Sequence, residues 1–199
     1  MTVAYFCKRI LSSKKGQSLI ELTFIAPLML LLIFGVVEVG SVISTYLRIA
    51  QLTREGANLT SRGDPCNSPP TSPCQALDDV KKAALPFLGP YNQAQWKIIY
   101  SKITQDPTVP CNPPLTPCRY IISYQNNSNS YGTLGRTSQI GNLNDVVTLP
   151  GVATVQESQT FHAIEIFYDY GPSIITYVGK MINRNFYERT IFTDVSGKP

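Results

Sequence analysis

The sequence predicts an α+β protein in which one long N-terminal helix packs on a small antiparallel β-sheet. Two observations predict this fold. Residues 19–43 are apolar apart from Glu21, Glu38 and a few small or hydroxyl residues. Four later segments, residues 95–104, 119–125, 161–170 and 187–193, are rich in β-branched and aromatic side chains and are bounded by turn residues, as strands are.

The apolar run is long enough to cross a membrane, because about 20 apolar residues in a helix span the roughly 30 Å hydrocarbon core. A secretory signal has a shorter apolar core, about 7–15 residues, and a small-residue cleavage site after it. No convincing site of that kind follows Val37. We therefore expect a retained transmembrane helix that includes Leu19, Pro27, Gly35, Glu38 and Ile43. A proline near the start of a membrane helix is tolerated when neighbouring groups satisfy the freed carbonyl.

Basic residues before the run predict its orientation. Lys8, Arg9, Lys14 and Lys15 precede it, and no acidic residue comes before Glu21. Positive residues stay on the cytoplasmic side of a membrane helix. The N-terminus is therefore expected inside, and everything after residue 45 outside.

Two carboxylates lie in or near the span, and they call for different interpretations. An ionisable group at the centre of a membrane helix costs about 2.5–3.5 kcal/mol on insertion scales, so a retained one usually has a function. Glu21 lies inside the start of the apolar run and is the candidate for such a function. Glu38 lies roughly 25 Å further along a helix, which predicts a solvated acid at the outer interface.

Beyond the membrane the same helix is expected to continue to about residue 60. Ile43, Leu47, Ala50 and Ala57 have helical spacing and form the apolar stripe that we expect to pack on the folded domain. Residues 63–65, Gly-Asp-Pro, end the helix. Residues 77–88 read as a second helix. Residues 131–155 read as a long loop with a short strand near 152–155, and residues 174–182 as a further helix.

Four of the five cysteines fall in the outer part of the chain, where disulfides persist. They occur in two similar proline-rich segments that begin at Cys66 and Cys111. Four cysteines allow three pairings, and we favour the two local loops, Cys66–Cys74 and Cys111–Cys118. A metal site is disfavoured because these spacings, without a nearby histidine, fit zinc poorly. Peptide mapping without reduction distinguishes local from crossed pairing.

Composition excludes several functions. The chain carries 17 basic and 13 acidic residues, and four of the basic residues precede residue 17, so the remainder has 17 − 4 = 13 of each sign. Nucleic-acid binding is not expected, because it requires a basic patch. Neither a phosphate loop nor a nucleophile elbow occurs. His162 is the only histidine and is expected to make a structural hydrogen bond at the start of a strand. We therefore expect no enzyme activity and no cofactor.

A family resemblance rests on Lys14, Lys15 and Gly16, followed five residues after the glycine by Glu21 and then by the apolar run. This pattern resembles the cleavage and assembly signal of type IV prepilins. Residues 16–28, with Gly35, Glu38 and Gly40, resemble the TadE-like minor pseudopilins of the tight-adherence (Tad, or Flp) pilus machinery of bacteria. Residues 54–57 and 165–172 are similar to later segments of that family.

The resemblance implies a pilin-like fold and a division of the chain into a cytoplasmic leader (1–16), a transmembrane and extended helix (17–62) and a periplasmic α+β domain (63–199). Prepilin peptidase would cut after Gly16, leaving Gln17 as the new N-terminus and Glu21 in the first helical turn, where it sets assembly register. The implied partners are the peptidase, other pilins or pseudopilins, and the assembly platform in the inner membrane.

The alternative function is an uncleaved, membrane-anchored periplasmic scaffold or binding protein. Its N-terminal sequence would start at residue 1 or 2 and not at Gln17. A membrane-tethered enzyme is a third class, and the sequence holds no catalytic constellation that supports it. N-terminal sequencing of the membrane-extracted protein separates the first two.

Overall fold

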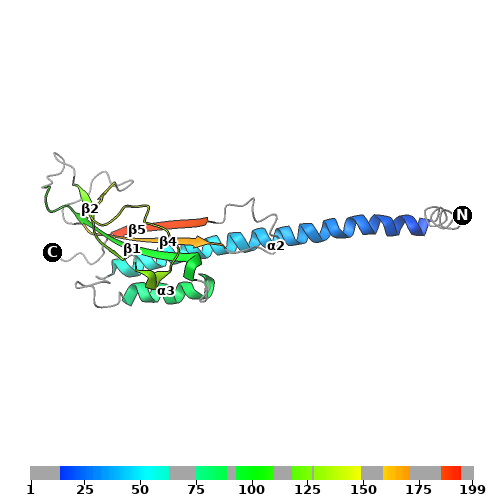
Figure 1. Cartoon of the computed structure of the whole chain (residues 1–199), viewed down its shortest axis with the longest axis horizontal. Helices are drawn as coiled ribbons and strands as arrows, with labels where there is room; N and C mark the ends of the chain where they lie inside the picture. The colour runs from blue at the N-terminus through cyan, green and yellow to red at the C-terminus, as the bar shows by residue number, and fades with distance from the viewer. Residues whose placement is uncertain are drawn as a thin grey trace.

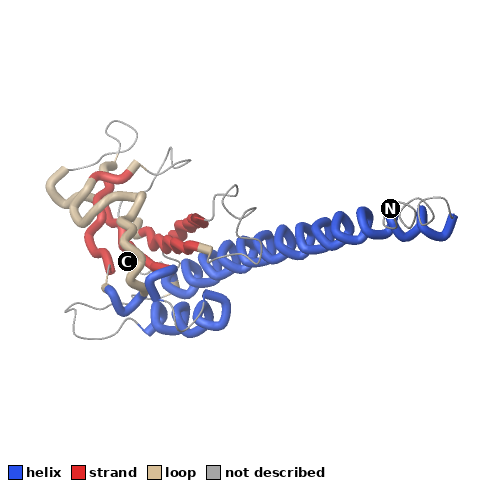
Figure 2. The backbone as a smooth tube through the Cα atoms, turned by 45° about the vertical axis from the view of Figure 1, so that its right-hand side comes forward, coloured by secondary structure: helices blue, strands red, loops and turns tan. Residues whose placement is uncertain are grey.

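A computed structural model describes residues 14–62, 75–88, 93–109, 118–126, 128–148, 159–170 and 185–193. A long helix carries a five-stranded sheet and a shorter helix at its C-terminal end, while its N-terminal half projects away from them (Figures 1 and 2). The predicted α+β class is confirmed.

The elements agree with the sequence expectations to within a few residues. The helices are α2 (Lys14–Ser61) and α3 (Gln75–Leu88), with short 3-10 turns η1 (Gln93–Gln95) and η2 (Asn129–Tyr131). The strands are β1 (Trp96–Gln105), β2 (Tyr120–Asn126), β3 (Val146–Val147), β4 (Phe161–Asp169) and β5 (Asn185–Thr193). Strand β3 was not predicted and lies within the expected long loop. The predicted strand at 152–155 and helix at 174–182 lie outside the described residues.

The sheet has the order β3-β2-β1-β4-β5, and each neighbouring pair is antiparallel. Its interior strand β4, between β1 and β5, is buried from Phe161 to Tyr168 because both faces of the sheet are covered. One face packs on α2 and α3 through a core that includes Ile49, Leu77, Trp96 and Ile164. The opposite face forms a second cluster of Ile103, Tyr120, Ile122, Val147, Phe161 and Ala163. Residues of alternate parity along β4 therefore belong to different cores, as the pleat requires.

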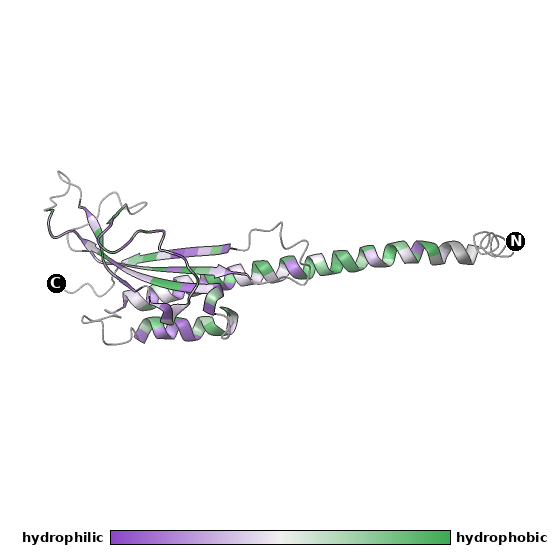
Figure 3. Cartoon of the chain, in the orientation of Figure 1, coloured by the Kyte–Doolittle hydropathy of each residue, from purple (hydrophilic) through white to green (hydrophobic). Residues whose placement is uncertain are grey.

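The face of α2 that packs on the domain differs from the predicted one. Ile43 is 53% exposed and Leu47 is 60% exposed, so only Ala57 of the predicted stripe is fully buried. We call the observed set the contact stripe; its buried or half-buried members are Glu38, Ser41, Thr45, Ile49, Leu52, Thr53, Gly56, Ala57 and Thr60. Figure 3 shows that the hydrophobic residues of the helix are concentrated instead on its projecting part.

Small and hydroxyl residues make up most of the contact stripe, beside the buried Ile49 and Leu52, and they allow the sheet to approach the helix closely. The hydroxyl groups are satisfied inside the helix: Thr53 donates to the carbonyl of Ile49 at 3.0 Å, and Thr45 donates to that of Ser41 at 2.9 Å. A hydroxyl bonded in this way can be buried without an unmet hydrogen bond. The prediction was wrong for Ile43 and Leu47 and correct for Ala57, which is buried, and in part for Ala50, which is half-buried. It failed where it relied on hydrophobicity alone, because that measure does not register small, self-satisfied residues as core.

Gly56 is the point of closest packing and gives a testable prediction. A Cβ at this position would lie 2.9 Å from Ile164 Cδ1 and 2.9 Å from Val80 Cγ2. Because these are side-chain ends that can shift in part, we expect Gly56→Ala to destabilise the domain by about 1–3 kcal/mol in denaturant unfolding. Gly40→Ala is the matched control, since nothing lies within 4 Å of its Cβ position and alanine favours the helix. Equal unfolding midpoints for both variants would contradict this packing.

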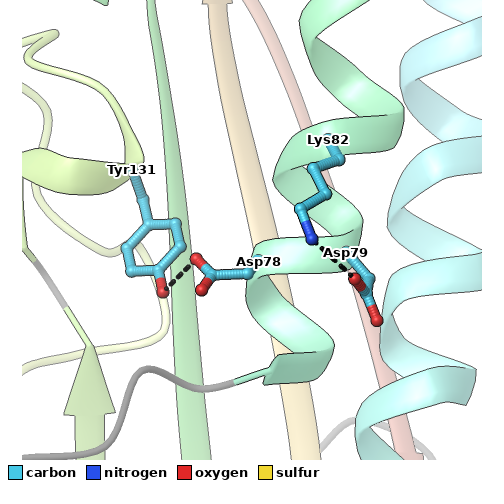
Figure 4. A network of polar contacts seen from close by, with 4 residues as sticks. All are labelled: Asp78, Asp79, Lys82 and Tyr131. Atoms are coloured by element: carbon cyan, nitrogen blue, oxygen red, sulfur yellow. Dashed lines mark hydrogen bonds and ion pairs between the residues drawn. The ribbon is translucent and has the colours of Figure 1, made fainter.

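Helix α3 is joined to the start of the long loop by a polar contact. Tyr131 in η2 donates its hydroxyl proton to Asp78 at 2.9 Å, while Asp79 and Lys82 form an exposed ion pair at 3.4 Å (Figure 4). Burial, with the Asp78 hydrogen bond adding to it, raises the pKa of Tyr131. The tyrosine therefore stays protonated and holds α3 beside β1 at any ordinary pH.

Candidate functional site: the projecting length of α2 and the adjoining end of the sheet

The projecting length of α2 is an exposed apolar rod. Its exposed large side chains include Leu22, Phe24, Ile25, Leu28, Met29, Leu30, Leu31, Leu32, Ile33, Phe34, Val36, Val37 and Val39. The helix continues through Pro27, and between Glu21 and Arg48 the only charged residue is Glu38. Among the described residues it is the one helix long and apolar enough to cross a membrane, and the most apolar part of it is not buried by the rest of the chain. This arrangement is consistent with a single-pass membrane anchor.

The N-terminal end of this rod carries the predicted processing and register residues. Helix α2 begins at Lys14, so its backbone runs across the Gly16–Gln17 bond and Leu19. For Gly16, Gln17 and Leu19 the structure describes the backbone alone. Glu21 is exposed on the rod, one residue beyond Ile20 where the exposed apolar surface begins. A carboxylate at this place is accessible to a neighbouring chain.

Glu38 does not have the environment predicted for it. It is 6% exposed, whereas a solvated interfacial acid was expected. The reason is its position on the contact stripe: Ser41, one turn further, donates its hydroxyl proton to the backbone carbonyl of Glu38 at 2.9 Å. The folded domain therefore reaches α2 one turn earlier than the sequence indicated.

Tyr170 makes the contact between the domain and this turn. Its Oη lies 2.9 Å from Ser41 Oγ. Because Ser41 already donates to Glu38, the tyrosine is the donor in this second hydrogen bond. The end of β4 is thereby attached to the helix directly above the apolar rod.

An aromatic cluster occupies that end of the sheet. Phe186 at the start of β5 lies with its ring centroid 6.0 Å from Tyr46, 6.4 Å from Tyr168 and 6.2 Å from Tyr170. Tyr46 itself belongs to α2 and is 42% exposed. We call these four residues the aromatic foot. Figure 1 shows the end of β4 and the adjoining end of β5 lying beside the helix on the side of the sheet nearest the projecting rod.

On the rest of its circumference α2 remains apolar as far as Leu47. Ile43 and Leu47 are exposed there, and no atom lies within 4 Å of a Cβ built on Gly35 or Gly40. At these two glycines the helix carries no side chain, so other helices can approach its backbone closely.

A model of the TadE-like protein family matches residues 16–58. This N-terminal segment is TadE-like. The match confirms the predicted resemblance and covers the exposed rod, together with all but the last turn of the contact stripe. No curated protein and no solved structure matches the chain.

Beyond the TadE-like segment, the residue types that serve in catalytic or metal-binding groups include His162 and the described Cys, Asp and Glu side chains. His162 is 1% exposed, and its Nδ1 lies 2.7 Å from the hydroxyl of Tyr100, which confirms the structural hydrogen bond that was predicted. Among the described residues, no group of three or more His, Cys, Asp or Glu side chains is placed to hold a metal ion.

The cysteine predictions fall mostly outside the described residues, which include neither Cys66, Cys74 nor Cys111. Cys118 is described: it is disulfide-bonded and packs against the second hydrophobic cluster. The pairing itself, Cys66–Cys74 and Cys111–Cys118, stays a prediction.

Among the described residues of the domain, the most deeply buried carboxylate was not singled out by sequence. Glu165 on β4 is fully buried and accepts hydrogen bonds from the Ser138 hydroxyl, from the Gln139 amide at 2.9 Å and from the Tyr187 hydroxyl at 2.8 Å. Burial, followed by the bond to Glu165, raises the pKa of Tyr187. This carboxylate ties the long loop and the edge strand β5 to the interior strand β4.

We expect Glu165→Ala to destabilise the domain by on the order of 2–4 kcal/mol, because the Gln139 amide and Tyr187 hydroxyl would lose their acceptor inside the protein. Thermal or denaturant unfolding measures this loss. Glu55→Ala is the control, since Glu55 is exposed on α2 and surface changes cost within about 0.5 kcal/mol. Similar losses for the two variants would show that the Glu165 network contributes nothing specific.

Proposed function

We propose that this chain is a minor pseudopilin of a Tad-type pilus. It is anchored in the bacterial inner membrane by the projecting part of α2, with residues 1–16 as a cytoplasmic leader and residues 63–199 as a periplasmic domain. Its work is protein–protein packing: it primes or caps pilus assembly together with other pilins or pseudopilins and the assembly platform. Prepilin peptidase is its processing partner.

The observation that carries this proposal is the coincidence of a family match and an uncovered apolar surface on one segment. The TadE-like match spans residues 16–58, and the same stretch contains the apolar rod that the folded domain leaves uncovered. A helix of a soluble protein buries its apolar face, whereas this one exposes it over nearly its whole circumference. Lipid or other transmembrane helices are the surroundings that suit such a surface.

Glu21 has a specific role in the proposed assembly. After cleavage at Gly16 the helix would begin at Gln17, which brings Glu21 into its first turn. A carboxylate there is favoured by the helix macrodipole. It is also placed to pair with the α-amino group of a neighbouring subunit, which offsets the desolvation of both ions. The pair sets the register of one helix against the next.

Processing is tested with Gly16→Leu, expressed with and without an active prepilin peptidase. Leucine is bulky and favours helix, so α2 is expected to remain intact while cleavage is blocked. We expect the wild-type protein to migrate faster on immunoblots when the peptidase is present, and the variant to migrate as the precursor in both cases. Gly35→Ala, a change at a helical glycine with nothing within 4 Å, is expected to be processed normally.

N-terminal sequencing completes the test. A sequence starting at Gln17 in the wild type supports the pseudopilin proposal. A sequence starting at residue 1 or 2 in a peptidase-positive host overturns the processing step and leaves the anchored scaffold as the function.

A further inference from the structure

We propose that the aromatic foot rests in the headgroup region of the phospholipid bilayer on the side of the folded domain. Its exposed Tyr46 and half-buried Tyr170 and Phe186 would meet the lipid, while Tyr168 is buried and packs behind them. The foot would fix how deeply α2 is inserted and how the domain stands on the membrane. This inference rests on the proposed membrane anchoring, and it assigns a lipid-contacting role to the folded domain as well as to the helix.

The first argument is the depth of each residue along α2. At 1.5 Å per residue, the stretch from Ile20 to Gly40 covers about 30 Å, the thickness of the hydrocarbon core. The next turns, from Ser41 to Leu47, cover about 10 Å more, so they cross the headgroup layer on that side, which is roughly 5–8 Å thick, and reach its outer edge. The foot lies at this level because Tyr170 bonds to Ser41 at 2.9 Å and Tyr46 belongs to these turns.

The second argument comes from the opposite side of the helix and does not depend on the foot. Exposed apolar side chains continue through Ile43 and Leu47, above the level at which the domain begins. The exposed surface then changes at once: Arg48, Gln51, Arg54 and Glu55 follow. Leu59 is the next large apolar side chain exposed on α2, and it is isolated among polar residues. Because the continuous apolar surface ends at Leu47, the apolar or interfacial surroundings also end there, level with the foot.

The third argument is the chemistry of the foot. Tyrosine and other aromatic rings are enriched at membrane–water interfaces, where the ring meets the acyl boundary and the hydroxyl stays wet. The neighbouring charges agree with the headgroup layer and exclude the hydrocarbon core: Glu188 accepts from Tyr46 at 3.3 Å, Asp169 ends β4 and Arg48 is exposed. Glu38, one turn deeper, is buried by the chain itself and so is kept out of lipid.

The experiment measures contact between the foot and lipid. Full-length protein is reconstituted into vesicles of phosphatidylethanolamine and phosphatidylglycerol, some carrying bromine near the headgroup end of the acyl chains. Phe186→Trp places a fluorescent reporter in the foot. Phe192→Trp is the matched control: it lies on the same face of β5, about 20 Å further along the strand. The native Trp96 is fully buried and gives the same background in both.

We expect the brominated lipid to remove most of the added emission of Phe186→Trp and none of that of Phe192→Trp. Tyr46→Trp, at an exposed position of the helix, is expected to behave like Phe186→Trp and serves if the latter folds poorly. If brominated lipid quenches Phe186→Trp and Phe192→Trp equally, and the protein resists alkaline extraction, the lipid contact of the aromatic foot is overturned while membrane anchoring stands. Protein that is extracted by alkali overturns membrane anchoring, and the foot with it.

Discussion

Cells that carry Glu21→Ala in place of the wild-type chain are expected to lose their pili while the protein still reaches the membrane. Alanine is easier to insert than a carboxylate, so anchoring by the apolar rod is not impaired. Assembly, in contrast, would leave the α-amino group of the neighbouring subunit buried without a partner, at a cost of about 3–5 kcal/mol. That cost lowers the assembly equilibrium by more than about a hundredfold.

Piliation is counted by electron microscopy, and membrane insertion is followed by immunoblotting of the membrane fraction. Glu55→Ala is the matched control, because it removes an exposed carboxylate from the same helix above the membrane level. The control is expected to assemble normally. Normal pilus numbers in Glu21→Ala cells would remove the register role from this carboxylate.

Gly132→Ala is expected to destabilise the folded domain by on the order of 3 kcal/mol or more. This loss is larger than the one expected for Gly56→Ala. Gly132 has a φ of +99° and a ψ of 150°, a region that essentially only glycine occupies. A Cβ built there would lie 2.1 Å from the carbonyl oxygen of Trp96. Backbone cannot move aside as a side-chain end can, so the strain must spread into β1.

The local hydrogen bonds explain why the chain needs glycine at this place. Thr133 donates its amide to Gln93 O at 2.7 Å and Leu134 donates to Trp96 O at 3.3 Å, so the long loop is attached to the start of β1 immediately after Gly132. Gly135→Ala, in the same loop, has nothing within 4 Å of its Cβ and is the control. Denaturant unfolding compares the two, and a loss below about 1 kcal/mol for Gly132→Ala would show that the loop is free to shift.

The strands were predictable because each carries its own pattern. Alternation along β4 placed Ile164, Ile166 and Tyr168 on one face, and these residues do lie in the core beneath α2 and α3. The two-residue strand β3 was missed because Val146 and Val147 are too few to show a period. Its pairing to Tyr120 and Ile121 depends on a loop whose path local sequence does not indicate.

The candidate site was predictable at one end only. The apolar rod, its length and the acid at its start are visible in the order of residues. The aromatic foot was not, because Tyr46, Tyr170 and Phe186 are far apart in sequence and meet only when the sheet closes on the helix. The sequence around a strand tyrosine shows the same alternating pattern whether its side chain lines a core or faces a membrane.

By itself the sequence determined that the chain has a membrane-length helix, a resemblance to TadE-like proteins and a sheet of antiparallel strands, because periodicity and local motifs are properties of neighbouring residues. Tertiary structure decided which face of α2 is buried, that Glu38 and Glu165 are enclosed and that aromatic side chains gather above the rod. These outcomes depend on how closely the sheet approaches a stripe of α2 that contains glycine, alanine and hydroxyl residues bonded within the helix. That distance is set by the shapes of the sheet and the helix together, so neither segment of sequence determines it alone.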